Sequence, residues 1–515
     1  MHKNVFEGSR DKILSLESAA AWSDDMQRHG SKVVLAHGVF DLLHIGHLRH
    51  LKLARDEGDY LIVSVTADRF VGKGPGRPVF TDAVRAEMLG SLDVVDRVVI
   101  SQHSSAEAII SRLRPSIYVK GAEYRDATAD VTGKIVDERR AVEEVGGKLV
   151  FTDDVVHSSS SLINRFLDVY DPSLRDYLLT ARETGLKDRV FDAVERVSEL
   201  KVLLVGETIV DEYNFVQPMS KTPKENIISN RFMGRELYAG GVIAAANHAA
   251  SMCAEIGVIT SLGESDSYEQ LVRKSLKPNV HLHAVFRPDA PTTRKSRSVD
   301  PNYYRKLFEV YHFQDKPMDA AYQAKIDTAI ARMAGQYDLV IVTDFGHALI
   351  APSTIAALEK HAPFLAINAQ SNSGNFGYNL ITKYTKADFI CIDEGEARLA
   401  TADKFSSLED VVRGKLASQI NCDRFIVTKG KQGCLTYDRG GDLHHIPAFT
   451  STVLDTVGAG DAFLSVASPL VAAGVELPVA GFIGNAVGAM KVNIVGHRHS
   501  IEKAPLLKYL TALLK

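Results

Sequence analysis

The sequence predicts two α/β domains, each built on a parallel sheet covered by helices. The chain has 515 residues, which is too long for one ordinary domain. Apolar strand-like runs such as "KVVLAHGVF" (32–40) alternate with helical segments, and a second series of this kind begins at "KVLLVGETIVDEY" (201–213). Strands that are apolar on both faces and alternate with helices are typical of buried parallel sheets.

The composition indicates which classes of binding partner this chain is suited to. The chain is 45% hydrophobic and 24% charged, with a formal net charge of −4, which favours neither a nucleic acid nor an anionic membrane as partner. The four cysteines have no CxxC spacing, which disfavours structural zinc and favours a reduced compartment. No signal-peptide core and no uncharged membrane-spanning run is present in the sequence. We therefore expect a cytoplasmic protein that acts on small molecules.

The elements of the first domain follow in order. Residues 1–30 are predicted to form a polar helical extension, and the strand at 32–40 leads into the helical segment 44–58, which a glycine ends. A continuous strand at 60–67 follows, and residues 85–100 and 104–121 each give a helix and then a strand. The first domain is therefore predicted at 31–167.

A charged segment with helical periodicity at 168–199 is predicted to connect the two domains. The second domain is predicted at 200–515. Beyond its opening strands, apolar runs at 338–343, 364–368, 388–392 and 424–428 predict further strands of its sheet.

The stretch "HGVFDLLHIGH" (37–47) contains the first candidate site. His44 and His47 are three residues apart at the start of a helix, where they share one face beside free backbone N–H groups and the positive end of the helix dipole. This position suits a phosphate, and Gly46 leaves room for close approach. Capping or packing histidines are the alternative. A metal site is less favoured, because the spacing and glutamate of the zincin motif are lacking.

This stretch resembles the GxFDxxHxGH signature of the cytidylyltransferase-like nucleotidyltransferases, over roughly residues 31–167. The resemblance implies that His44 and His47 stabilise the α-phosphate of ATP, CTP or another nucleoside triphosphate while pyrophosphate leaves. Lys73, in "FVGKGPGRP" (70–78), stands where the family places a phosphate-binding lysine, although a flexible basic turn also fits. The arginine of some members is missing before 159–160, which leaves triphosphate contacts there open. The implied phosphate or nucleotide contacts are Gly38, Phe40, Asp41, Arg77, Lys120, Gly121, Ser159 and Ser160, with His37 as a further candidate.

The string "LDTVGAGDAF" (454–463) contains the second candidate site. Its small residues let backbone N–H groups converge on an anion at a helix N-terminus. Asp461 is placed to accept the proton of a hydroxyl that attacks a γ-phosphate. A GAGD sequence alone also fits a turn with a capping aspartate, but the longer string favours catalysis.

This string resembles the signature of the ribokinase-like (PfkB) carbohydrate kinases, over about 200–515. The resemblance implies ATP and Mg²⁺, with Asp461 as the catalytic base and Glu396 of "DEGE" organising the metal through water. Asp393 replaces the usual asparagine of that motif. The implied nucleotide contacts are Thr428, Gly430, Gly433, Gly458, Ala459, Gly460 and Asn485, and the implied sugar contacts are Asp211, Gly240 and Gly241.

Two departures from the family pattern affect the sugar site. Ala244 and Ala245 stand where an asparagine is usual, which leaves Asn247 as its candidate substitute. The polar insert "NAQSNSGNFGYN" (368–379) is either a substrate or partner loop or a solvated one. Many ribokinase-like proteins dimerise, so a homodimer is expected.

Together the two halves predict consecutive steps toward a nucleotide-activated sugar. The pairing is similar to that of the bifunctional heptose kinase/adenylyltransferase family of surface-polysaccharide synthesis, with the domain order inverted. A sugar phosphate and a nucleoside triphosphate are then the partners. One alternative is a cytidylyltransferase for a polyol phosphate fused to the kinase for its precursor. Another is an enzyme with one activity, whose kinase-like half serves as a sensing or scaffold module.

Overall fold

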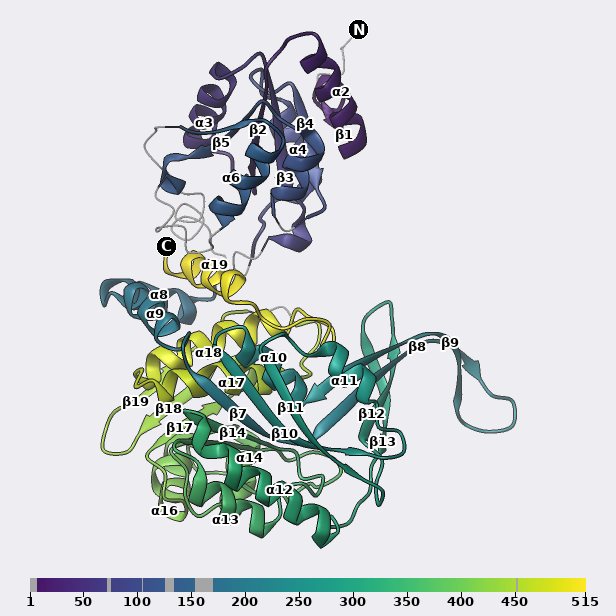
Figure 1. Cartoon of the computed structure of the whole chain (residues 1–515), viewed down its shortest axis with the longest axis vertical. Helices are drawn as coiled ribbons and strands as arrows, with labels where there is room; N and C mark the ends of the chain where they lie inside the picture. The colour runs from purple at the N-terminus through teal and green to yellow at the C-terminus, as the bar shows by residue number, and fades with distance from the viewer. Residues whose placement is uncertain (1–6, 72–75, 104, 126–133, 153–169, 451–452) are drawn as a thin grey trace. The chain divides into compact units, whose positions relative to one another are not determined.

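The structure is a computed structural model that describes residues 7–71, 76–103, 105–125, 134–152, 170–450 and 453–515 (Figure 1). Its contacts divide the chain into two compact units. The first comprises Met1–Leu178 together with Leu507–Lys515, and the second comprises Leu179–Leu506. Each unit is built on a sheet with helices on both faces, which confirms the predicted α/β class.

The sheet of the first unit is entirely parallel, in the order β1-β4-β3-β2-β5-β6. Helices α3 and α4 pack on one face, and α2, α5 and α6 pack on the other. The strands are β1 (Ile13–Leu14), β2 (Val33–Gly38), β3 (Tyr60–Thr66), β4 (Arg97–Ser101), β5 (Ile117–Gly121) and β6 (Lys148–Thr152). The helices are α1 (Glu7–Arg10), α2 (Leu16–Arg28), α3 (Ile45–Asp56), α4 (Asp82–Gly90), α5 (Glu107–Leu113) and α6 (Lys134–Glu144).

The strand order places the first candidate site. After β2 the chain adds β3 and β4 on one side and then β5 and β6 on the other, so the order reverses between β2 and β5. Ligands of open parallel sheets bind at such a reversal, beyond the carboxyl ends of the strands. Here those ends are Gly38 and Gly121.

The N-terminal segment is not only helical. It contributes the two-residue strand β1, which pairs with β4, and helix α2 buries Ala19 and Ala20 in the core of the first unit. A strand of two residues has no periodicity to read in a sequence. The predicted connector contains two helices, α8 (Pro172–Glu183) and α9 (Leu186–Arg196).

The larger sheet of the second unit has nine strands in the order β11-β10-β7-β14-β15-β16-β17-β18-β19. Helices α10, α17 and α18 lie on one face, and α12, α13 and α14 lie on the other (Figure 1). The strands are β7 (Lys201–Gly206), β10 (Glu255–Gly263), β11 (Val280–Arg287), β14 (Leu339–Asp344), β15 (Leu365–Ala369), β16 (Phe389–Asp393), β17 (Arg424–Thr428), β18 (Cys434–Asp438) and β19 (Leu443–Ile446). The covering helices are α10 (Val242–Ala250), α12 (Ala320–Met333), α13 (Pro352–His361), α14 (Glu394–Thr401), α17 (Ala459–Ala472) and α18 (Leu477–Lys491), and the four strands predicted between 338 and 428 are all present.

A second, four-stranded sheet projects from this unit in the order β13-β12-β8-β9 (Figure 1). Its strands are β8 (Thr208–Lys221), β9 (Ile228–Gly241), β12 (Thr293–Asp300) and β13 (Arg305–His312). Strand β8 follows β7 directly, so this sheet joins the larger one at the residues predicted to bind sugar.

The remaining helices include α11 (Glu269–Ser275) and α19 (Lys503–Leu514). Within the described ranges, no helix combines the length and the apolar character needed to cross a membrane. All four cysteines are buried, and none forms a disulfide.

Candidate active sites

The two histidines of the first site lie together at the start of helix α3. His44 is the N-cap residue, and its Nδ1 accepts a hydrogen bond from the Gly46 N–H at 3.1 Å. The rings of His44 and His47 stack with their centroids 4.0 Å apart, and Phe40 packs edge-on against His47 at 5.3 Å. The capping interpretation is therefore confirmed for His44, and its phosphate role stays a prediction.

The turn before the histidines needs its particular residues. Phe40 adopts a left-handed backbone conformation with φ of 50°, and its ring lies over Gly38, where a Cβ would come within 3.1 Å of it. Asp41 is buried and accepts the backbone N–H of Val79 at 2.6 Å. Asp41 therefore holds the segment that follows the predicted phosphate loop.

The structure describes some of the remaining predicted residues of the first site and not others. Lys120 forms an ion pair of 2.8 Å with Glu138, and Tyr118 and Glu138 hold the pKa of this lysine above its usual value despite burial. Burial lowers the pKa of Arg77, opposed by Tyr170 and Asp41. Gly121 ends β5 at the strand reversal. Lys73, Ser159 and Ser160 lie outside the described residues.

His37 is part of the sheet interior. Its Nδ1 lies 3.1 Å from the Ser64 hydroxyl, and burial lowers its pKa to about 3. The ring is therefore neutral, and its hydrogen bond with Ser64 joins β2 to β3.

The first unit also contains a buried arginine that the sequence did not single out. The Arg85 guanidinium donates to the carbonyls of Phe80 and Thr66, each at 2.9 Å, and to the Val39 carbonyl. It also forms an ion pair of 2.6 Å with Asp68. Arg85 thus joins the turn after β2 to the end of β3.

The GAGD turn of the second site leads into helix α17. Gly458 is the N-cap residue in the left-handed conformation (φ 74°), and Asp461 lies in the first turn with 8% of its surface exposed. The first N–H groups of a helix lack intrahelical acceptors, so they and the dipole attract an anion here. Burial raises the pKa of Asp461 to about 6, opposed by His497, Lys295 and Lys491 and reinforced by Asp211.

Asp211 is held between two cations. It forms ion pairs with Arg297 of β12 and, at 3.2 Å, with Nε2 of His497. Burial opposes its charge, but the His497 hydrogen bond and the Arg297 charge outweigh this and hold the pKa of Asp211 below its usual value. A Cβ on Gly240 would lie 2.0 Å from the Asp211 carboxylate, so the glycine is required for this close approach. Gly241, also in the left-handed region (φ 59°), precedes α10.

Two residues near the C-terminus were missed in the sequence. His497 contacts the turn so closely that a Cβ on Gly458 would lie 2.4 Å from its ring. Lys491 is completely buried, and its ammonium donates to the carbonyls of Val457 and Gly496 at 2.7 and 2.8 Å. The only available signal was the run "GHRH" at 496–499, since a lysine inside an apolar helix looks like a surface residue until packing is known.

Asp455, the first aspartate of the motif, has a structural position. Its carboxylate accepts from the Tyr213 hydroxyl at 2.6 Å, from the Lys306 ammonium at 2.7 Å and from the Gly496 N–H at 2.8 Å. It therefore fixes the GAGD turn to the four-stranded sheet and to the segment after α18.

Family comparison supplies the identity. The model of the pfkB family carbohydrate kinases matches residues 199–504, more than half of the chain. The chain belongs to the PfkB family. The cytidylyltransferase-like model matches residues 35–166, so both predicted resemblances are confirmed.

The relatives are similar over part of the chain. The Bifunctional protein HldE of Gluconobacter oxydans (strain 621H) is 39% identical over 155 residues, which are 30% of this chain and 31% of that protein. The protein of the same name from Syntrophotalea carbinolica is 38% identical over 163 residues, 31% of this chain and 32% of that protein. The matched stretch is thus about a third of the length of these curated relatives. The ribokinase of Thermotoga maritima aligns at 19% identity with a TM-score of 0.47, over 61% of this chain and 99% of that one.

The residues predicted to contact the nucleotide in the PfkB domain lie at or near tight turns. Gly430 and Gly433 both adopt positive φ, and a Cβ on Gly433 would lie 1.9 Å from the Ile446 carbonyl. Asn485 of α18 donates to the carbonyls of Ile446 and Pro447 at 3.1 and 3.2 Å. Asn485 thus holds the segment after β19, while Thr428 ends β17 next to the turn.

Glu396 is the candidate metal residue of the PfkB domain. It forms a capping box at the start of α14, where its Oε2 accepts the Asp393 N–H at 2.8 Å and its Oε1 accepts the Ser371 N–H at 3.2 Å. Burial and the charges of Asp393 and Asp461 raise the pKa of Glu396 to about 8. Because its oxygens already accept backbone N–H groups, it fits a metal held through water and not a direct ligand.

The side chains of Asn247 and of the polar insert form hydrogen bonds with backbone groups. The Asn247 amide donates to the Ser275 carbonyl at 2.9 Å and accepts the Lys277 N–H at 3.1 Å. In the insert, the amides of Asn375 and Asn379 donate to the carbonyls of Phe345 and Asp344 at 2.7 and 3.0 Å. The insert is therefore anchored on the end of β14 and is not simply solvated.

Proposed function

We propose that this chain is a bifunctional enzyme that makes a nucleotide-activated sugar for surface polysaccharide. The PfkB domain phosphorylates a hydroxyl of a heptose-like sugar or sugar phosphate with ATP. The cytidylyltransferase-like domain transfers a nucleotidyl group to a sugar 1-phosphate and releases pyrophosphate.

The observation that carries the kinase proposal is the state of Asp461. The acceptor hydroxyl attacks the γ-phosphorus, its proton passes to the Asp461 carboxylate, and ADP leaves. A general base works best when its pKa lies near the working pH, and burial brings the pKa of Asp461 to about 6. The charged Asp211 then accepts hydrogen bonds from sugar hydroxyls, with Arg297 and His497 fixing its orientation.

The transferase proposal is supported by the stacked pair of His44 and His47 at the strand reversal. A phosphate oxygen of the sugar 1-phosphate attacks the α-phosphorus, and pyrophosphate departs with the bonding electrons. The imidazole groups and the N-terminus of α3 stabilise the charge that develops on the α-phosphate oxygens. Positioning supplies the rest of the rate, because phosphoryl chemistry needs little covalent help from the protein.

Magnesium would neutralise the charge of the ATP phosphates in the PfkB domain. Glu396 would hold it through water, and Asp461 would lie in the same electrostatic environment, since the charge of Asp461 acts on Glu396. A cation there would favour the ionised form of Glu396, whose pKa burial has raised.

We further propose a homodimer that acts in the cytoplasm. Exposed apolar side chains lie on the edge strands β9 and β13 of the four-stranded sheet and in the turn between β12 and β13, among them Ile228, Phe232, Phe308 and Tyr303, with 64, 62, 56 and 82% of their surface exposed. Exposed apolar side chains on edge strands offer a surface for pairing with a second copy. Light scattering after gel filtration tests this, and a monomer at micromolar concentration would contradict it.

The decisive experiment separates the two activities in the full-length protein. With heptose phosphates and Mg²⁺-ATP, ADP release reports the kinase and pyrophosphate release reports the transferase. We expect Asp461→Asn to abolish ADP release only and His47→Ala to abolish pyrophosphate release only. Asp442→Asn and His29→Ala, both at exposed positions, are the matched controls.

Release of neither product by the wild-type protein would refute the proposal. Loss of both activities from either substitution would refute independent sites. CTP in place of ATP in the pyrophosphate assay identifies the nucleotide of the transferase.

A further inference from the structure

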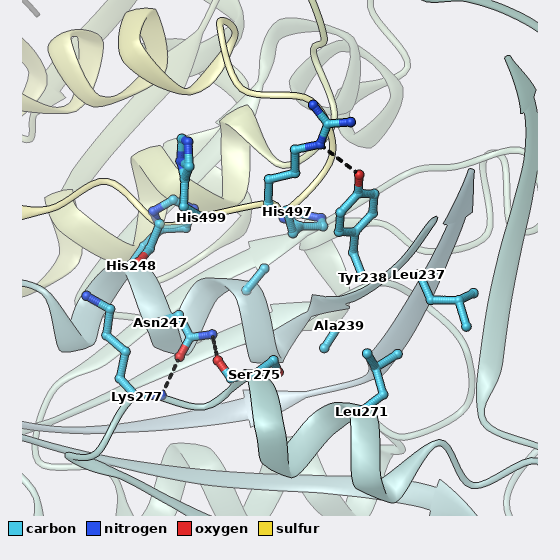
Figure 2. Close-up of a pocket in the computed structure, with 13 residues that line it drawn as sticks. Leu237, Tyr238, Ala239, Asn247, His248, Leu271, Ser275, Lys277, His497 and His499 are labelled. Atoms are coloured by element: carbon cyan, nitrogen blue, oxygen red, sulfur yellow. Dashed lines mark hydrogen bonds between the residues drawn. The ribbon is translucent and has the colours of Figure 1, made fainter. Parts of the chain in front are cut away.

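A cavity of about 280 Å³ lies in the second unit beside His497 (Figure 2). One part of its wall is apolar and is formed by Leu237, Ala239, Ala244 and Leu271. Three imidazoles, those of His248, His497 and His499, line it as well. Asp461 and Asp211 do not line this cavity, so it is distinct from the phosphoryl-transfer site.

Most other polar groups of the wall are already engaged. The Lys277 ammonium binds both carboxylate oxygens of Glu502, at 2.6 and 2.7 Å. The Arg498 guanidinium pairs with Glu236 at 2.9 Å. The amide of Asn247 is occupied by the backbone, as the dashed lines in Figure 2 show. These groups hold the wall in place.

The three histidines differ from the other polar groups of the wall, and Nδ1 of His497 is itself buried without a hydrogen-bond partner within the described ranges. Only 2% of His248 is exposed, and its Nδ1 accepts the Ile501 N–H at 3.1 Å, so the proton of the neutral ring is on Nε2. Nε2 has no acceptor among the residues that the structure describes, and there the His499 ring has no hydrogen-bond partner either. His248 Nε2 therefore offers a hydrogen-bond donor to an acceptor in the cavity.

The electrostatic environment favours an anion. Burial and then the charges of His497, Lys491 and Lys277 all lower the pKa of His248, so the groups around it make the local potential positive. In the described part of the chain, no group of three histidine, cysteine or acidic residues could hold a metal ion. An anionic acceptor therefore fits the cavity better than a cation does.

We propose that this cavity binds a small phosphate monoester. Its phosphate accepts hydrogen bonds from His248 Nε2 and from the His499 ring, because one phosphate group has enough oxygens to serve both donors. Its carbon portion contacts the apolar wall at Leu237 and Leu271. His497 both lines the cavity and pairs with Asp211, so this side chain links the cavity to the residue predicted to bind the sugar.

Calorimetric titration of the full-length protein tests the site with three probes: glycerol 3-phosphate, inorganic phosphate and uncharged glycerol. We expect the ester to bind most tightly, inorganic phosphate to bind more weakly, and glycerol not to bind. Binding of inorganic phosphate without binding of the ester would overturn the proposal, because the apolar wall would then contribute nothing.

Two variants assign the binding to this cavity. His248→Asn keeps an acceptor near the position of Nδ1 for the Ile501 N–H but removes the Nε2 donor, and His499→Ala alters an exposed residue. Each should weaken ester binding by about tenfold or more. His444→Asn, at an exposed position of β19, should bind like the wild type. Unchanged ester affinity in both cavity variants would overturn the proposal.

Discussion

Replacing Asp461 with asparagine should remove kinase activity and also stabilise the second unit. The carboxylate is buried, and the difference between its pKa of about 6 and the ordinary value of 3.8 corresponds to about 3 kcal/mol of destabilisation when it is ionised. Asparagine has nearly the same shape and no charge. The buried amide loses part of this gain through incomplete hydrogen bonding, so we expect about 1–3 kcal/mol at pH 8.

The pH dependence fixes the sign of this effect. The folded-state pKa of Asp461 is raised, so the wild-type protein has its full stability from this group below about pH 4 and loses it as pH rises through about 6. The advantage of Asp461→Asn should therefore be complete at pH 8, about half as large at pH 5 and nearly absent below about pH 4. Kinase activity of the wild type should rise with pH through about 6 and then level off, since the base must be ionised.

Differential scanning calorimetry between pH 4 and 8 measures the stability, and ADP release measures the activity. An increase in melting temperature of about 2–6 °C at pH 8, with at least a 100-fold loss of turnover, is expected. An Asp461→Asn protein that is no more stable than the wild type at pH 8, or that still phosphorylates sugar, would refute this assignment. Asp442→Asn is the control for both readouts.

Four further substitutions test the surroundings of the two sites. Gly458→Ala should lower the stability by about 1–3 kcal/mol and abolish kinase activity, because a Cβ there meets His497 and the residue has φ of 74°. Gly460→Ala has open space around its Cβ, so it should keep the stability and weaken ATP binding only. Melting temperatures and ATP titrations compare the two variants. Lys491→Met leaves two buried carbonyls without their donor and should lower the stability by about 2–4 kcal/mol. Kinase activity should be lost and transferase activity kept. Equal loss of both activities would contradict this prediction. Arg85→Lys should lower the stability of the first unit by about 2 kcal/mol or more in denaturant titrations, since an ammonium cannot replace all four guanidinium contacts, and an unchanged midpoint would show that these contacts are dispensable.

Much of the fold could be predicted from local patterns. Apolar runs gave β2, β3, β7 and β14, because a strand buried on both faces must be apolar throughout. The predicted connector contains two helices, α8 and α9, because their charged and apolar residues follow the helical period. Strand β1 could not be predicted, since two residues form a strand only because the edge of β4 is available to pair with them.

The candidate-site residues also divide into those that the local sequence predicts and those that it does not. The turn at Gly458 with Asp461 in the first turn of the helix could be predicted, because small residues ahead of an apolar helical run indicate a tight turn at a helix start. The roles of Asn247 and Asn485 were not, because an amide can bind either a ligand or a backbone carbonyl. Which of these occurs depends on the chain segment that packs opposite the amide.

The sequence by itself determined which residues are glycine, histidine and aspartate at each turn, and hence which chemistry each half can perform. Only the tertiary structure decided the electrostatic state of those residues. His497 and Arg297 reach Asp211 from distant segments, and burial moves the pKa of Asp461 toward neutrality. Charge interactions and desolvation depend on distance and on exclusion of water, and both are set by packing between segments that are far apart in the chain.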